Sequence, residues 1–134
     1  MYAVDKCRQQ MELNIKLKRV YEPADDSDGL RILVDRMWPR GIKKRDLKYD
    51  IWAKDVTPSL GLRRFFHDNP YGNWNEFADR YRIELIENPT IGDLIEQIRE
   101  SGFYTVTLLY GFRNPVKNHA VVLREVLMSR LGGE

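Results

Sequence analysis

The sequence predicts one small α/β domain, in which a mainly parallel sheet is flanked by helices in a Rossmann-like layered arrangement. Continuous apolar or β-branched runs at residues 30–36 and 104–110 are typical of buried strands. Helical patterns separate these two runs, so a parallel pairing through a crossover connection is the default topology. These observations place the chain in the α/β class.

Three strands are predicted. Residues 14–21 alternate apolar side chains with lysines, which indicates a half-exposed strand at or near a sheet edge. The turn formers of residues 22–29 predict a loop that leads into the buried strand 30–36. The run 104–110 combines β-branched and aromatic residues and predicts the last strand.

Helices are predicted from terminal residues and apolar stripes. The first covers about 58–67, and capping-box spacings open the next two. The residues that begin or end these three helices are Thr57 with Pro58, Asn73 with Glu76, Thr90 with Asp93, and Gly102. The last helix is predicted to be capped by Asn114, to start at Pro115 and to end at Gly132, and its predicted buried stripe includes Val116, Ala120, Leu123 and Leu127.

Composition limits the classes of protein that remain. A chain of 134 residues with a net charge of +2 fits one globular domain, with residues 1–13 as a polar extension before a domain at 14–134. Cys7 is the single cysteine, which excludes an internal disulfide and a cysteine-rich zinc site and is compatible with the cytoplasm. No apolar run reaches the roughly 18 residues of a membrane span, so no membrane partner is expected.

The sequence predicts no cofactor and no metal site. Two histidines and one cysteine leave few ligands for a transition metal. The Walker loop, the Gly-x-Gly-x-x-Gly fingerprint, the Gly-x-Ser-x-Gly elbow and the His-Glu-x-x-His motif are all missing from the sequence.

Charged and polar residues follow the two central strands. Ligands of α/β proteins lie outside the carboxyl ends of parallel strands, and two parallel strands bring these ends to one edge. We therefore expect a shared site at that edge. Its members are Asp35, Arg36, Trp38 and Arg40 after the first run, and Tyr110, Arg113, Asn114, Asn118 and His119 after the second.

This set of residues suits a small anion. Arg36, Arg40 and Arg113 would bind phosphate or carboxylate through charge-assisted hydrogen bonds, beside the N-terminus of the last helix. Asp35 and His119 are the candidate acid and base if a reaction takes place. Trp38 and Tyr110 would supply apolar walls, although both are also typical core residues.

Several motifs together resemble a known family. They are Val34-Asp-Arg-Met-Trp-Pro-Arg-Gly41, Trp52-Ala-Lys54, Leu62-Arg-Arg-Phe-Phe-His67 and Leu108-Leu-Tyr110 followed by Asn118-His-Ala-Val-Val-Leu123. In this order they resemble the YeaO-like family, domain of unknown function 488, over about residues 14–130. The resemblance implies a small cytoplasmic α/β protein and names no reaction. Asn114 stands where the family usually carries an acidic residue.

A second function remains open. Residues 31–48 carry seven Lys or Arg against two Asp, a net charge of +5, which would suit a nucleic-acid accessory protein. A concave cluster of Arg36, Arg40 and Arg113 favours a small anionic ligand. A flat basic stripe that these arginines share with Lys43, Lys44, Arg45 and Lys48 favours nucleic acid.

Overall fold

The computed structural model describes residues 13–132, and the predicted extension at residues 1–13 lies almost wholly outside them. Within the described part, one sheet has the strands β1 (Asn14–Arg19), β2 (Leu30–Leu33), β3 (Ile51–Trp52) and β4 (Thr105–Tyr110). Its order is β1-β4-β2-β3, and every pairing is parallel. The predicted α/β class, the parallel pairing and the edge position of the first strand are confirmed.

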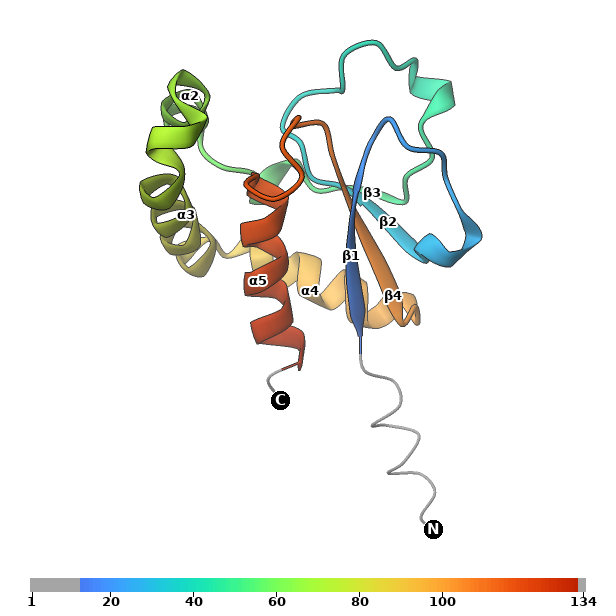
Figure 1. Cartoon of the computed structure of the whole chain (residues 1–134). Helices are drawn as coiled ribbons and strands as arrows, with labels where there is room; N and C mark the ends of the chain where they lie inside the picture. The colour runs from blue at the N-terminus through green and yellow to red at the C-terminus, as the bar shows by residue number, and fades with distance from the viewer. Residues whose placement is uncertain (1–12, 133–134) are drawn as a thin grey trace.

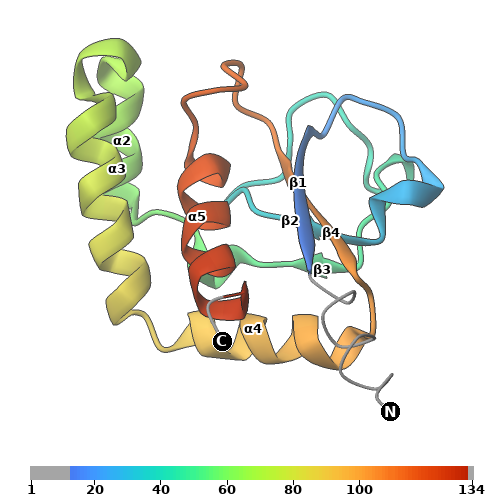
Figure 2. The same cartoon turned by 60° about the horizontal axis from the view of Figure 1, so that its bottom comes forward.

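The helices of the described residues are α2 (Leu60–Asp68), α3 (Pro70–Glu87), α4 (Thr90–Ser101) and α5 (His119–Gly132). Figures 1 and 2 show these helices gathered on one side of the sheet. Their buried side chains form one core with Ile32 of β2 and Leu108 of β4. Short 3-10 turns lie at Asp26–Asp28 (η1), Lys44–Asp46 (η2) and Lys54–Val56 (η3).

The opposite face of the sheet is covered by the connection between β2 and β3. Leu33 and Leu109 pack there with Leu47, and Trp38 covers them from the connection. Trp38 also meets Trp52 edge to face, with ring centroids 5.5 Å apart. The loop that follows β2 is therefore fixed by aromatic packing.

The second strand is shorter than predicted. It ends at Leu33, and Asp35 and Arg36 lie beyond it, although the Val34 N–H still donates to the Leu109 carbonyl at 2.9 Å. The strand β3 was not predicted, because a run of two residues is too short to show any periodicity.

Two predicted helix starts are wrong by a few residues, and a third is wrong by one residue. Ser59, not Thr57, caps α2, with its Oγ accepting from the Leu62 N–H at 3.3 Å. Asn69, not Asn73, caps α3, and Pro70 is its first residue. Thr90 begins α4 without a capping box. The predicted end of α4 is confirmed, because Gly102 adopts a left-handed conformation with φ of 79°.

The start of α5 is the largest correction. Asn114 accepts hydrogen bonds from the Val116 and Lys117 N–H groups, at 2.8 and 3.1 Å, and so closes a turn instead of opening a helix. The helix begins at His119, where the Asn118 Oδ1 accepts from the Val121 N–H at 3.0 Å. Val116, predicted to be buried, is 69% exposed.

The face of the sheet opposite the helices also carries a buried carboxylate. Asp28 is fully buried and forms ion pairs with Lys16, Lys18 and Arg31. Burial raises the pKa of Asp28, but hydrogen bonds from Lys18, the Asp25 backbone, Arg31 and Lys16 outweigh it and lower the pKa from 3.8 to about 2. This charge cluster joins η1 to β1 and β2.

We predict that Asp28→Asn destabilises the protein by about 3 kcal/mol, because it leaves the buried Arg31 and the partly buried Lys18 without their charged partner. Urea unfolding at pH 7 measures the loss. The carboxylate stabilises the fold above the unfolded pKa near 3.8, and this stabilisation disappears as the pH falls toward 2. The exposed neighbour Asp26 is the control, and Asp26→Asn should change stability by less than about 0.5 kcal/mol. Equal losses in the two variants would contradict the assignment.

Candidate functional site

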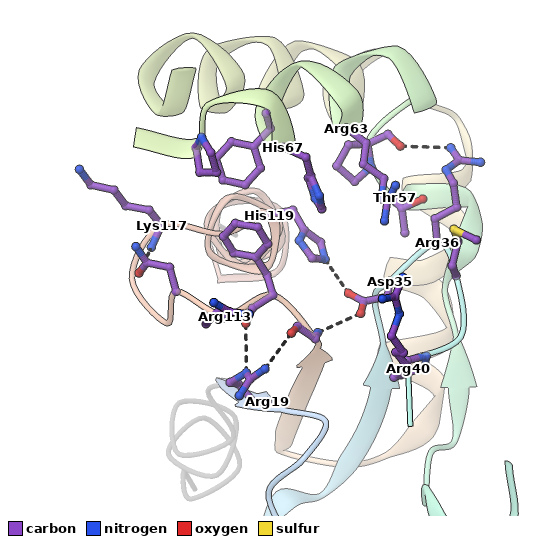
Figure 3. A pocket seen from close by; sticks show the side chains of 18 of the residues that line it. Arg19, Asp35, Arg36, Arg40, Thr57, Arg63, His67, Arg113, Lys117 and His119 are labelled. Carbon is purple, nitrogen blue, oxygen red and sulfur yellow. Dashed lines mark hydrogen bonds and ion pairs between the residues drawn. The ribbon is translucent and has the colours of Figure 1, made fainter. Parts of the chain in front are cut away.

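A pocket of about 1240 Å³ opens beside the carboxyl ends of the strands. Its walls come from the segments that follow β1, β2 and β4, and from α2 and the start of α3. Figure 3 shows charged side chains from these segments around the pocket. Six cations and one carboxylate line it: Arg19, Arg36, Arg40, Arg63, Arg113, Lys117 and Asp35.

Asp35 links three of these segments. Its Oδ2 accepts from the Gly111 N–H at 2.9 Å, and its Oδ1 lies 2.9 Å from the His119 Nε2. Its backbone carbonyl accepts from the Trp52 indole at 2.7 Å. A Cβ at position 111 would come within 2.9 Å of the Asp35 Oδ2, so this close approach favours glycine. Both carboxylate oxygens are thus engaged within the protein.

The contacts of His119 define its protonation pattern. The His119 Nε2 lies 3.0 Å from the Val34 carbonyl as well as 2.9 Å from Asp35. A carbonyl oxygen can only accept, so Nε2 carries a proton. In the neutral ring Nδ1 is then an acceptor, and protonation of Nδ1 would make it a second donor. Figure 3 shows the ring of His119 directed toward Asp35.

The cations of the pocket lack carboxylate partners. Across residues 13–132, no ion pair joins any of the six lining cations to an acidic side chain. Arg19 donates instead to the Gly111 and Phe112 carbonyls, at 3.0 and 3.1 Å. Arg36 donates to the Pro58 carbonyl at 3.1 Å, and its Nε is buried without an acceptor. The pocket therefore carries more positive than negative charge, since Asp35 is its single lining carboxylate.

Burial and the positive charge of the pocket lower the pKa of His67 in α2. Partial burial lowers its pKa below the usual 6.5, and the positive charges of Arg63 and of His119, when protonated, lower it further, against the opposing charge of Asp35. Its ring packs against Phe112, with centroids 5.4 Å apart. An anion in the pocket would favour the protonated form of His67.

Seven of the residues predicted for the site line the pocket: Asp35, Arg36, Trp38, Arg40, Arg113, Asn114 and His119. Two others do not. Tyr110 is 3% exposed and packs in the core with the helices, and Asn118 is fully buried as the cap of α5. The predicted helix N-terminus is also displaced, because the turn at 114–118 uses its own N–H groups.

The sequence analysis missed four basic residues of the pocket, Arg19, Arg63, His67 and Lys117. Arg19 had a usable signal, because it lies near the carboxyl end of the strand predicted at residues 14–21. Arg63 and His67 had none, since their position depends on how α2 packs.

Two findings concern metals and membranes. In the part of the chain that the structure describes, no group of three or more His, Cys, Asp or Glu is placed to hold a metal ion. None of the helices within residues 13–132 combines the length and the apolar character that a membrane span requires.

The fold and this pocket define a small parallel α/β protein with a basic site at the carboxyl edge of its sheet. A family model described as "Inactive DUF488-N3 subclade" matches residues 14–134. The chain therefore belongs to the YeaO-like DUF488 family.

Curated relatives span the same domain. "Uncharacterized protein YeaO" of Escherichia coli (strain K12) is 46% identical over 117 residues, covering 87% of this chain and 99% of its own. "Uncharacterized protein Rv3073c" of Mycobacterium tuberculosis (strain ATCC 25618 / H37Rv) is 40% identical over 119 residues, covering 89% and 98%. "Uncharacterized protein Mb3100c" of Mycobacterium bovis matches to the same extent. No solved structure matches the chain.

We predict that Arg63→Gln raises the pKa of His67, because it removes a positive charge that disfavours the protonated ring. The chain has two histidines, so a proton NMR titration of the ring signals resolves each. Arg64→Gln on the same helix is the matched control, since Arg64 is exposed and does not line the pocket. A His67 titration that moves equally in both variants would contradict a specific effect of Arg63.

Proposed function

We propose that this protein binds a small ligand bearing phosphate or carboxylate in the pocket at the carboxyl edge of its sheet. The observation that carries the proposal is the charge balance: six cations surround the pocket, and its one lining carboxylate is already bonded to Gly111 and His119. Like charges brought together in a partly shielded site repel one another, and a bound anion relieves that repulsion.

Binding without catalysis fits the chemistry of the walls. Asp35 and His119, the candidate acid and base, face no serine or cysteine among the lining residues. The Thr57 hydroxyl is there, but it donates to the Lys54 carbonyl at 2.7 Å. The family description "inactive" agrees with a binding role. In this proposal Asp35 positions the Gly111 loop and His119, and the protein works in the cytoplasm, as the family resemblance implies.

The arrangement of the basic residues favours a pocket ligand over nucleic acid. Arg36, Arg40 and Arg113 come together in one cavity, which is the arrangement expected for a small anion. Arg31 of the basic segment is buried with Asp28 and adds nothing to a surface stripe. Lys43 and Lys44 are exposed and lie outside the lining.

The first test measures the affinity of the protein for inorganic phosphate by titration calorimetry. We expect Arg113→Ala to weaken binding about tenfold, because one charge-assisted hydrogen bond to an exposed guanidinium contributes at least about 1.5 kcal/mol. We also expect Arg40→Lys to bind as weakly as Arg40→Ala if the contact uses the planar fork of the guanidinium. Thermal unfolding without phosphate should be nearly unchanged in these exposed variants.

Lys44→Ala is the control, since Lys44 is exposed and does not line the pocket. A labelled oligonucleotide tests the other function in parallel. Wild-type phosphate affinity in both arginine variants, with oligonucleotide binding lost in a Lys43, Lys44 and Lys48 triple alanine variant, would replace the pocket by the basic segment as the functional surface.

Binding should also depend on pH in a defined direction. A bound anion raises the lowered pKa of His67, so the protonated ring strengthens binding. This gain is complete below the pKa of His67 in the free protein, which lies under 6.5, and is lost as the pH rises through the pKa in the complex. Sulfate is the suitable probe because its charge is constant over this range. We expect His67→Asn to flatten the profile, and an unchanged profile would exclude His67 as its source.

A further inference from the structure

The pocket is larger than a lone anion needs. Cavities that bury whole drug-sized ligands measure about 300–1,000 Å³, and this one measures about 1240 Å³. Besides the arginines, its lining includes the aromatic rings of Tyr21, Trp38, Tyr71 and Phe112. The ligand should therefore carry an apolar, flat part in addition to its anionic group.

Tyr21 is the ring best prepared to contact such a part. It is 49% exposed, yet it is held at two points. Its hydroxyl donates to the Arg40 carbonyl at 2.9 Å, and the Arg19 guanidinium lies 4.8 Å from its ring centroid. Arg19 is itself fixed by the Gly111 and Phe112 carbonyls. A ring fixed before binding loses little conformational entropy when a ligand stacks on it.

The other aromatic residues are less suited to stacking. The Trp38 indole donates to the Ile42 carbonyl at 2.6 Å and packs edge to face against Tyr49 and Trp52. The ring of Phe112 lies against Phe66 and His67. Tyr71 is 84% exposed, and its side chain makes no hydrogen bond or ring contact with another residue in 13–132. Tyr21 alone among these four combines exposure with a fixed position.

We propose that the ligand is a nucleoside monophosphate, with its phosphate among Arg36, Arg40 and Arg113 and its base in contact with the Tyr21 ring. This inference rests on the proposed function, since the same cations hold the phosphate. Both parts match the pocket: guanidinium groups suit phosphate oxygens, and an aromatic side chain stacks on any base. Arg19 lies against the Tyr21 ring, with its guanidinium 4.8 Å from the ring centroid, and so orders the ring before a ligand binds.

The experiment compares three probes by calorimetry: inorganic phosphate, ribose 5-phosphate and adenosine 5′-monophosphate. We expect adenosine monophosphate to bind about tenfold more tightly than ribose 5-phosphate, the increment that one base stacked on an aromatic ring supplies. Tyr21→Leu should remove this increment. Tyr21→Leu and Tyr21→Phe both lose the hydroxyl bond to the Arg40 carbonyl, so ribose 5-phosphate should bind the two variants with equal affinity, which also shows that both are folded. Tyr21→Phe keeps the ring and should keep most of the increment.

Tyr104→Leu is the matched control, because Tyr104 is also exposed but lies at the opposite end of β4. Equal affinities of the wild type for adenosine monophosphate and ribose 5-phosphate would overturn the nucleotide assignment while leaving the phosphate pocket intact. Failure of all three probes to bind would overturn the proposed function itself. A 5′-phosphorylated oligonucleotide that binds over tenfold more tightly than adenosine monophosphate, and loses this gain in the triple alanine variant of Lys43, Lys44 and Lys48, would identify a polymer in place of the nucleotide.

Discussion

The Asp35 carboxylate is the contact on which the arrangement at the carboxyl edge of the sheet depends. One of its oxygens accepts from the backbone of Gly111 and the other meets His119, so it joins the end of β2 to the loop after β4 and to the first residue of α5. The Trp52 indole fixes its backbone from the other face of the sheet. A parallel sheet brings strand ends to one edge, but this carboxylate determines how close together they come.

Two groups of charges in the protein contrast with each other. Around Asp28, three cations surround one fully buried carboxylate, and each is part of the folded structure. Around the pocket, six cations stand beside a single carboxylate, Asp35, whose oxygens are bonded to Gly111 and His119. The first group is complete without a ligand and serves the fold. The second is incomplete, which is why binding is the function that the site supports best.

The connection between β2 and β3 gives this site rigidity. It carries Arg36 and Arg40 to the pocket and packs Trp38 against Leu33 and Leu109 behind the sheet. The Tyr21 hydroxyl holds the same connection through the Arg40 carbonyl. Cations on a loop that is fixed on both sides lose little conformational entropy when they bind a ligand. This favours specific recognition over diffuse electrostatic attraction.

The sequence by itself determined the parallel α/β class, the three longer strands, the α4 end at Gly102 and the convergence of Asp35, Arg36, Arg40, Arg113 and His119. Each follows from local patterns or from the rule that parallel strands end at one edge. Tertiary structure alone decided the rest. Asn114 and Pro115 fit a helix start and a turn equally well, and contacts of Asn118 and His119 selected the turn. Tyr110 turned into the core because strand register sets the face of each side chain. Arg63 and His67 entered the pocket through the packing of α2, a long-range contact that leaves no mark in the sequence around them.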